Sequence, residues 1–212
     1  MRRFQVQRSL PAAAEAPEAY LHRLGELAGI LRGLPWLLAG GLTIPLRIGR
    51  FYRRHYDVDI AFPVEALPDI DAAMRAAGFY LSTHFPMSLH GRCRFAVSVP
   101  LRHDGWLARH RPRKLKYRDG TGTRAAPHLL AAVEALPFRL ADGCLLTCDG
   151  RHRLPMVRPL AGHRARVGSE EIDCLDLHYV AELKRGGGDP KHALDLSVVA
   201  HQLPRHVGAE GD

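Results

Sequence analysis

Two stretches decide the fold of this chain: WLLAGG at residues 36–41 and GRFYRRHYDVDI at residues 49–60. The first is a short apolar run that ends in a glycine pair, which predicts a buried strand followed by a tight turn. The second ends in alternating acidic and apolar residues, which predicts another strand from Tyr56 to Phe62. Because side chains alternate between the faces of a strand, Asp57 and Asp59 are expected to project from the same face.

Two carboxylates on one face suit a divalent cation. Hard ions such as Mg²⁺ prefer carboxylate oxygens together with phosphate oxygens, and two ions roughly 3.5 to 4 Å apart can stabilise attacking and leaving oxygens together. An Asp-x-Asp pair also occurs on exposed strands and loops that bind no metal, so the interpretation depends on its context. Asp57 and Asp59 are the candidate metal ligands.

The residues before this pair suit a polyphosphate. Gly40 and Gly41 have no Cβ and allow backbone amides to approach a phosphate closely. Cationic side chains that could offset the charge of a triphosphate follow the glycines: Arg47, Arg50, Arg53, Arg54 and His55.

In its spacing, this combination resembles the small-molecule nucleotidyltransferases that adenylylate aminoglycosides and lincosamides. The resemblance covers about residues 34 to 63: an apolar strand, a glycine pair, then a Gly-Arg, an Arg and a His before the Asp-x-Asp strand. It implies an α/β fold of the polymerase-β type, with a mixed central sheet flanked by helices and helical elements at the C-terminal end.

The resemblance also implies roles for individual residues. Asp57 and Asp59 would hold two Mg²⁺ ions and take part in catalysis, with an NTP, expected to be ATP, as co-substrate. The residues expected to bind the nucleotide are Gly40, Gly41, Arg50, Arg53 and His55, with Lys191 added from the C-terminal region.

The C-terminal match is looser. The segments AELK at 181–184 and DPKHALDL at 189–196 look like the helical Lys elements found late in these enzymes. By this similarity Lys191 would contact the nucleotide phosphates and Asp195 would brace its helix. A lysine at the start of a helix is also commonly only a solvated side chain.

One family feature is missing where it is expected. These enzymes usually carry a third carboxylate on a later strand, which activates the acceptor hydroxyl or helps to bind metal. The corresponding stretch here, residues 94–99, offers no acid. Asp104, just after that stretch, is the candidate for this catalytic role, and Asp119 is a more remote one.

Other elements follow from hydrophobic periodicity and turn residues. Expected helices lie from Pro17 to about Leu31, just before Gly49, at 67–77, near 129–136, at 172–184, and from Asp189-Pro190 to a point before Pro204. Expected strands lie at 36–39, 79–89 and 94–101, with short strand-like pieces between 137 and 167 and a pause in the regular core at 109–123. We expect a core at residues 1–125, a C-terminal extension packed on it at 126–204, and a loose tail at 205–212.

Composition and charge limit the class of protein. The longest apolar stretch, residues 34–48, is interrupted by prolines, a glycine pair and an arginine, so it predicts no membrane span, and we expect a cytoplasmic protein. The formal net charge of +8 favours partners that carry phosphate. The basic run Arg109 to Arg118 could bind RNA with Tyr117 stacking on a base, could line the substrate groove, or could be a solvated loop.

A zinc site is a weaker alternative. Cys144, Cys148 and His152 recur every four residues and would share one face of a helix, but no fourth ligand is evident and buried free cysteines are common. Hydrolase, P-loop and paired-cysteine redox motifs are missing from the sequence.

We therefore expect a Mg²⁺-dependent enzyme that moves a nucleoside monophosphate from an NTP to a hydroxyl of a small molecule. Aminoglycosides are polycations and this chain is basic, which leaves other acceptors open. One alternative is a toxin-like nucleotidyltransferase that acts on RNA or protein. Another is a non-catalytic nucleotide- or RNA-binding module that has lost its third acid.

Overall fold

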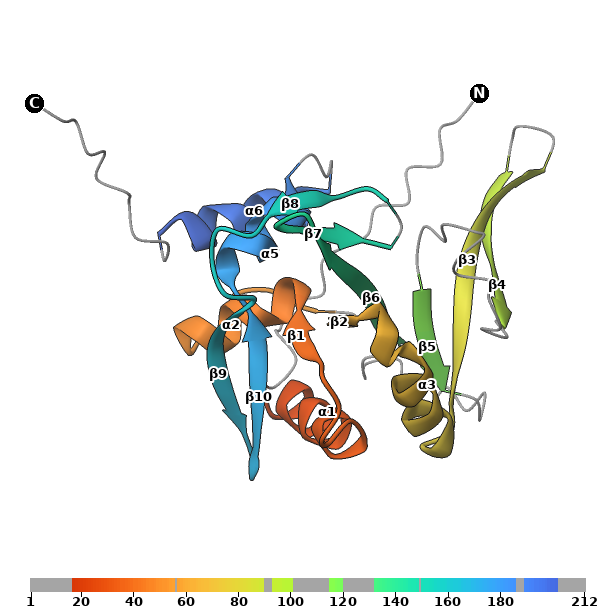
Figure 1. The fold of residues 1–212 in the computed structure, drawn as a ribbon, viewed down its shortest axis with the longest axis horizontal. Coiled ribbons are helices and arrows are strands. Elements are labelled where there is room, and N and C mark those ends of the chain that lie inside the picture. Colours follow the sequence, from red (N-terminus) through yellow and green to blue (C-terminus); the bar gives the residue numbers. More distant parts are fainter. Residues whose placement is uncertain are drawn as a thin grey trace, which may run out of the picture.

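A mixed β-sheet with helices on both faces organises the chain (Figure 1). The computed structural model describes residues 17–55, 57–89, 93–100, 115–119, 132–148, 150–185 and 189–201. Ten strands form one sheet in this described part, and its main path runs β4-β3-β5-β6-β2-β1-β10-β9. Strands β7 and β8 lie off this path, with β7 paired to β6 and β8 paired to β7.

The helices of the described residues are α1 (Pro17–Ile30), α2 (Thr43–Ile48), α3 (Leu67–Ala76), α5 (Leu177–Lys184) and α6 (Pro190–Ala200). The strands are β1 (Leu37–Ala39), β2 (Val58–Pro63), β3 (Phe79–Leu89), β4 (Cys93–Pro100), β5 (Leu115–Asp119), β6 (Ala132–Ala141), β7 (Cys144–Thr147), β8 (Arg153–Pro155), β9 (Ala161–Val167) and β10 (Glu170–Leu175).

Local patterns account for the first half of the fold. Tyr20, Leu24, Leu27 and Leu31 recur at helical spacing, and all four are at most 2% exposed where α1 packs on the sheet. Helix α2 ends at Gly49, whose φ of 73° is readily adopted by glycine. The expected helix at residues 67–77 and the antiparallel pair β3–β4 are also confirmed.

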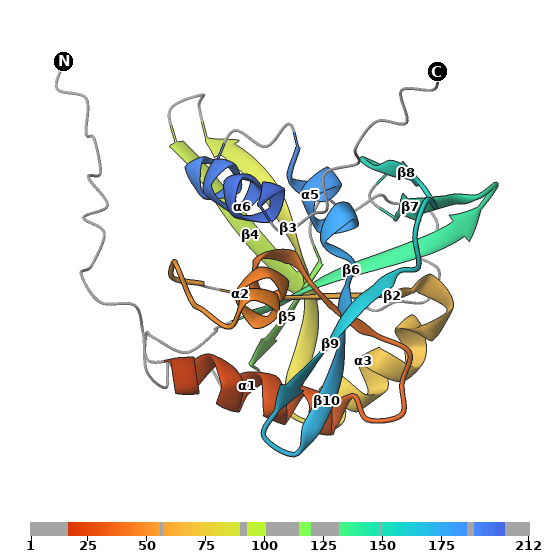
Figure 2. The same cartoon turned by 90° about the vertical axis from the view of Figure 1, so that its left-hand side faces the viewer.

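Side-chain alternation along β2 divides the core between the two faces of the sheet. Val58, Ile60 and Phe62 are fully buried against the side that α1 and α3 cover. Ala61 faces a second core, which also contains buried residues of β6, β7, α5 and α6. Figures 1 and 2 show α1 and α3 on one side of the sheet, and α5 and α6 on the other. Asp57 and Asp59 have the parity of Ala61 and so face the α5–α6 side.

The strand order places residues from both halves of the chain at the centre. Strand β2 pairs antiparallel with β1 and parallel with β6, and β1 pairs parallel with β10. Strands β6 and β10 come after residue 125, so the sheet itself continues past the boundary expected between core and extension.

Three sequence-based expectations were wrong. The expected helix near residues 129–136 is instead strand β6 from Ala132 onward, because its backbone pairs with β2 on one side and β5 on the other, and this tertiary context overrides helix propensity. The expected helix at 172–184 is strand β10 followed by α5. The expected pause in the regular core at 109–123 contains strand β5, in which Leu115 and Tyr117 from the basic run are buried.

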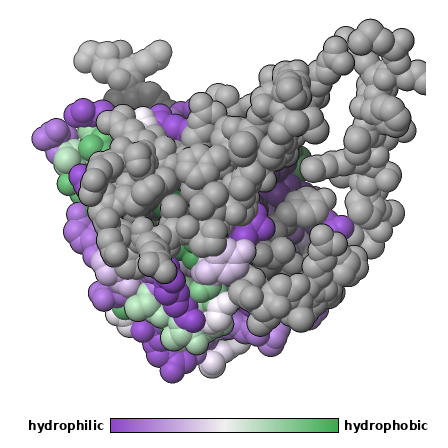
Figure 3. Space-filling model, turned by 90° about the vertical axis from the view of Figure 1, so that its right-hand side faces the viewer, coloured by the Kyte–Doolittle hydropathy of each residue, from purple (hydrophilic) through white to green (hydrophobic). Residues whose placement is uncertain are grey.

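Several expectations fall on residues outside the described ranges, among them the loose tail at 205–212. No helix in the described ranges is long and apolar enough to cross a membrane. In the face shown in Figure 3, the described atoms mix polar and apolar areas.

Replacement of Leu24 by Ala tests how strongly α1 is bound to the sheet. Leu24 is fully buried, so its truncation removes apolar contacts and leaves a cavity. We expect a loss of about 2 to 5 kcal/mol in the free energy of unfolding, measured by urea denaturation. The matched control is His22→Ala on the same helix, where the side chain is 74% exposed and the expected change is within about 0.5 kcal/mol. An equal change in both variants would contradict the packing of α1.

Candidate active site

Four neighbouring strands bring the chemistry-bearing residues into one row. Asp59 on β2 lies opposite Ala39 of β1 on one side and opposite Glu134 of β6 on the other. Glu134 in turn lies opposite Lys116 of β5. The register therefore places an acid, a second acid and a lysine side by side on the α5–α6 face of the sheet.

Three carboxylates gather in this row. Asp57 immediately precedes β2, and an oxygen of each of Asp57, Asp59 and Glu134 lies within 4.8 Å of the others. Glu134 is 8% exposed, and the side chain of Asp57 is 30% exposed. Among the His, Cys, Asp and Glu side chains of the described residues, these three lie close enough together to share a metal ion. Hard oxygen ligands at this separation are the set that Mg²⁺ favours.

Burial and charge raise the pKa of Asp59. Burial has the largest effect, followed by the negative charges of Asp57 and Glu134, and together they move the pKa to about 7. The negative charge on Asp59 is therefore unfavourable without a cation, as expected of a carboxylate placed where a metal would compensate it.

Lys116 supplies one positive charge to this cluster. Its Nζ lies 3.2 Å from Glu134 Oε2 and 3.4 Å from Asp57 Oδ2. Burial alone would lower the pKa of Lys116, but the carboxylates of Glu134 and Asp57 raise it above its ordinary value. Lys116 is thus charged and held against the acids.

The glycine pair approaches the acids closely. Gly40 has φ +66°, and a Cβ on it would lie 1.8 Å from Asp59 Oδ2. A Cβ on Gly41 would lie 2.2 Å from an Nη of Arg53 and 3.2 Å from the His55 ring. The turn after β1 therefore requires glycine at both positions, with Asp59 below one and Arg53 beside the other.

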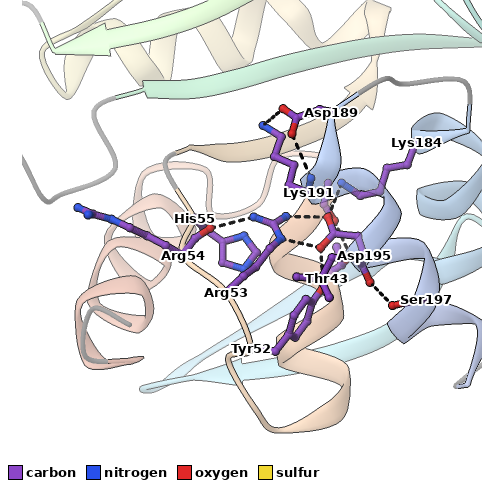
Figure 4. A network of polar contacts seen from close by, with 12 residues as sticks. Thr43, Tyr52, Arg53, Arg54, His55, Lys184, Asp189, Lys191, Asp195 and Ser197 are labelled. Carbon is purple, nitrogen blue, oxygen red and sulfur yellow. Dashed lines mark hydrogen bonds and ion pairs between the residues drawn. The ribbon is translucent and has the colours of Figure 1, made fainter. Parts of the chain in front are cut away.

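A second polar centre lies on α6. Asp195 is fully buried and accepts hydrogen bonds from Arg53 Nε at 2.6 Å, from an Arg53 Nη at 2.7 Å and from the Tyr52 hydroxyl at 2.7 Å. Lys184 on α5 adds an ion pair at 2.8 Å. Figure 4 shows Tyr52 and Arg53, from the segment between α2 and β2, and Lys184 of α5 converging on this carboxylate. Although burial opposes it, hydrogen bonds from Arg53, Lys184 and Tyr52 lower the pKa of Asp195 to about 2.

His55 is held beneath the glycine turn. Its backbone N–H donates to the Tyr20 hydroxyl at 3.1 Å, and that hydroxyl donates to its carbonyl at 3.3 Å. The ring packs edge-on against Tyr20 and Phe51. Burial, followed by the nearby charge of Arg53, lowers the pKa of His55 to about 3, so the ring is neutral.

A cavity of about 280 Å³ opens over these residues. Residues expected from the sequence to bind metal or nucleotide that line it are Gly40, Gly41, Arg53, His55, Asp57, Asp59 and Lys191. The remainder of the lining includes Glu134, Lys184 and His192, together with Leu115, Ala135, Leu136, Pro137, Thr147, Cys148, Arg151, His152, Val180 and Leu183. Arg50, also expected to bind nucleotide, is exposed and does not belong to this lining.

The third carboxylate of this cluster is Glu134, which the sequence reasoning did not propose. The expected candidate Asp104 lies outside the described residues, and Asp119 is the last residue of β5. Glu134 sits in the run AVEALPF, where Ala, Glu and Leu favour a helix. Pro137 could have indicated a strand here, because a proline disfavours a continuing helix. An acid inside an apolar strand is unusual, and this could then have singled out Glu134.

Two other interpretations of the sequence are corrected. Tyr117 is fully buried in the sheet, so it is not available to stack on a nucleic-acid base. Cys144 lies in strand β7, whereas Cys148 and His152 lie in the segment that leads to β8, so the three do not share a helix face as a zinc site would require.

Comparison with known proteins finds a family match and similar solved structures. Residues 28–100 match the aminoglycoside-2''-adenylyltransferase family. The lincosamide antibiotic adenylyltransferase LnuA, in its lincomycin-bound structure, has a TM-score of 0.51 at 12% identity, over 89% of this chain and 98% of that one.

The chain has the nucleotidyltransferase fold. The crystal structure of ANT(2'')-Ia in complex with adenylyl-2''-tobramycin has a TM-score of 0.49 at 15% identity, over 86% of this chain and 88% of that one. No curated protein matches the chain by sequence. The family match includes the glycine pair, Arg53 and both aspartates of this nucleotidyltransferase-fold chain, and ends before Glu134.

Replacement of Gly40 by Ala tests the close approach to Asp59. The variant incurs the cost of a left-handed residue, about 1 to 2 kcal/mol, and adds a clash with the carboxylate. Gly49→Ala is a matched control, because Gly49 has φ +73° but open space around its Cβ position. We expect Gly40→Ala to lower the free energy of unfolding, measured in urea, clearly more than Gly49→Ala does. Equal losses would contradict the close contact.

The raised pKa of Asp59 predicts a pH dependence. Folding favours the protonated form of Asp59. Its contribution to the free energy of unfolding is therefore complete below the ordinary pKa of an aspartate and is lost as pH rises through about 7. Asp59→Asn lacks this loss. In EDTA, we expect this variant to gain about 1 kcal/mol or more of unfolding free energy over wild type between pH 5 and pH 8.

The control for this pH series is Asp142→Asn, because the Asp142 side chain is 81% exposed and its φ of 50° is one that Asn tolerates. Its difference from wild type should stay constant over the same pH range. A constant difference for Asp59→Asn would contradict the raised pKa.

Proposed function

We propose that this chain is a Mg²⁺-dependent nucleotidyltransferase that moves a nucleoside monophosphate, expected to be AMP from ATP, to a hydroxyl of a small molecule and releases pyrophosphate. The observation that carries the proposal is the triad Asp57, Asp59 and Glu134, which faces one cavity together with the glycine pair. The resemblance to adenylyltransferases over residues 28–100 supports the same reaction.

The donor set fits the metal. Three carboxylates with oxygens within 4.8 Å offer hard ligands, and the Cβ-free Gly40 leaves room above Asp59. Asp57 and Asp59 would hold Mg²⁺, which when bound polarises the α-phosphate and offsets charge on the pyrophosphate.

The polyphosphate would lie along the cationic wall of the cavity. Arg53, Lys184 and Lys191 line it, and the first two are fixed by their contacts with Asp195. Because Asp195 orients these donors before any ligand arrives, they need little reorganisation to receive phosphate oxygens. Gly40 and Gly41 would present backbone amides to the same group.

Glu134 is the candidate general base. It would accept the proton of the acceptor hydroxyl as that oxygen forms a bond to the α-phosphorus and the bond to pyrophosphate breaks. The non-catalytic alternative rested on a missing third acid, and Glu134 removes that reason.

The lining favours an acceptor with few positive charges. Apart from the triad, the described residues of the cavity include no acid, but they do include Arg151, Lys184 and Lys191. A polycationic acceptor would meet repulsion here. A hydroxyl-bearing small molecule without several positive charges fits better. RNA recognition through residues 109–118 loses two of its elements, because Tyr117 is buried and Lys116 binds the acids.

The test is calorimetric binding of α,β-methylene-ATP with and without Mg²⁺, followed by pyrophosphate release with a panel of acceptors. Binding that depends on Mg²⁺ in wild type and is lost in Asp57→Asn is the expected result. If no NTP analogue binds in any condition, the proposal is wrong.

Glu134→Gln separates binding from transfer. We expect pyrophosphate release to fall by about 10²-fold or more, because the proton acceptor is lost, while Mg²⁺-dependent binding of the analogue persists. Glu171→Gln, at a side chain that is 63% exposed on β10, should leave both unchanged. Full turnover in Glu134→Gln would sink the assignment of Glu134 as general base.

A further inference from the structure

Lys116 places a permanent positive charge among the three carboxylates. Its side chain is 14% exposed, and its ammonium contacts both Glu134 and Asp57. Exposed ion pairs contribute little to stability because water screens them, but this ammonium is largely withdrawn from water and contacts two acids at once. It therefore contributes to the charge of the site in the way a bound cation would.

The sheet holds Lys116 at this place. Strand β5 is paired on both sides, so that Lys116 lies between Ser82 of β3 and Glu134 of β6. Its neighbours Leu115 and Tyr117 are buried on the opposite face and prevent the strand from turning over. Only a rotation of the side chain could take the ammonium away from the acids.

The charge of the site then differs from that of a plain acidic triad. Three ionised carboxylates carry three negative charges, and one ammonium reduces the total to two, which is the charge of one divalent ion. The two ion pairs of Lys116 go to Glu134 and Asp57. Asp59 and the second oxygen of Asp57 are the ligands that would hold that ion.

We propose that Lys116 is a built-in cation that takes the place of a second divalent ion, so that this site binds one ion and not two. The inference rests on the proposed function and departs from the two ions expected from the family resemblance. In this arrangement Lys116 holds Glu134 toward the cavity and neutralises part of its charge. It is a positioning residue that acts through Glu134.

The ion count tests this directly. Mn²⁺ is titrated into the full chain and counted by electron paramagnetic resonance, with and without α,β-methylene-ATP. We expect one Mn²⁺ per wild-type chain in both conditions. In K116M we expect a second ion, or a rise of about tenfold or more in Mn²⁺ affinity. Removal of a unit positive charge from beside the carboxylates that bind the ion lowers its electrostatic repulsion of Mn²⁺ by several RT.

Two variants isolate the charge. K116R keeps a cation on β5 and should retain one ion. The double variant K116M/E134Q removes both members of one ion pair and should also return to one ion. Circular dichroism and thermal unfolding show whether each variant folds, and the wild-type count alone decides the matter if K116M does not fold.

The outcomes separate this inference from the proposed function. Two Mn²⁺ ions in wild type, or the same count and affinity in wild type and K116M, overturns the role of Lys116. Failure of every variant to bind Mn²⁺ overturns it as well. One ion in wild type and a second in K116M, without nucleotide binding, supports Lys116 as the built-in cation and refutes the nucleotidyl transfer.

Discussion

The site depends on the parallel pairing of β2 with β6, which sets Asp59 directly beside Glu134. Two neighbouring carboxylates repel each other when both are ionised. Burial, followed by this repulsion, raises the pKa of Asp59. The backbone ladder of the two strands and the apolar packing of Val58 and Val133 on the far face hold the acids together. Lys116 on the next strand opposes the repulsion. The sheet register thus maintains a concentration of negative charge that the side chains alone would disperse.

The N-terminal part of this arrangement could be predicted from the sequence because its signals are local. A glycine pair after an apolar run and two aspartates two residues apart need no knowledge of distant partners. Glu134 could not be found in the same way, since its role depends on β6 being a strand, and its neighbours Ala135 and Leu136 favour a helix. Pairing of β6 with β2 on one side and β5 on the other decides the matter, and the β2 partner Asp59 lies more than seventy residues before Glu134 in the sequence.

Asp195 illustrates a second kind of limit. Family resemblance suggested that it braces its own helix, whereas its partners are Tyr52 and Arg53, 143 and 142 residues away in the chain. Spacing within α6 contains no information about those partners. The physical consequence is that one buried carboxylate orients the guanidinium of Arg53 and the ammonium of Lys184 toward the cavity wall. The positive side of the site is therefore organised by an acid, just as its negative side is organised with the help of a lysine.

The strand order also bears on how the chain is made. Strand β1 is flanked by β2 and β10, and β2 by β1 and β6, so each has one neighbour close in sequence and one that is synthesised much later. A nascent chain that ends before β6 exposes one unpaired edge on each of these strands, and such edges invite pairing with other chains. The edge of β2 is covered when β6 emerges, and that of β1 only when β10 follows. The strand that ends at the glycine turn is thus synthesised before the other strands of the described sheet and is among the last to gain both of its partners.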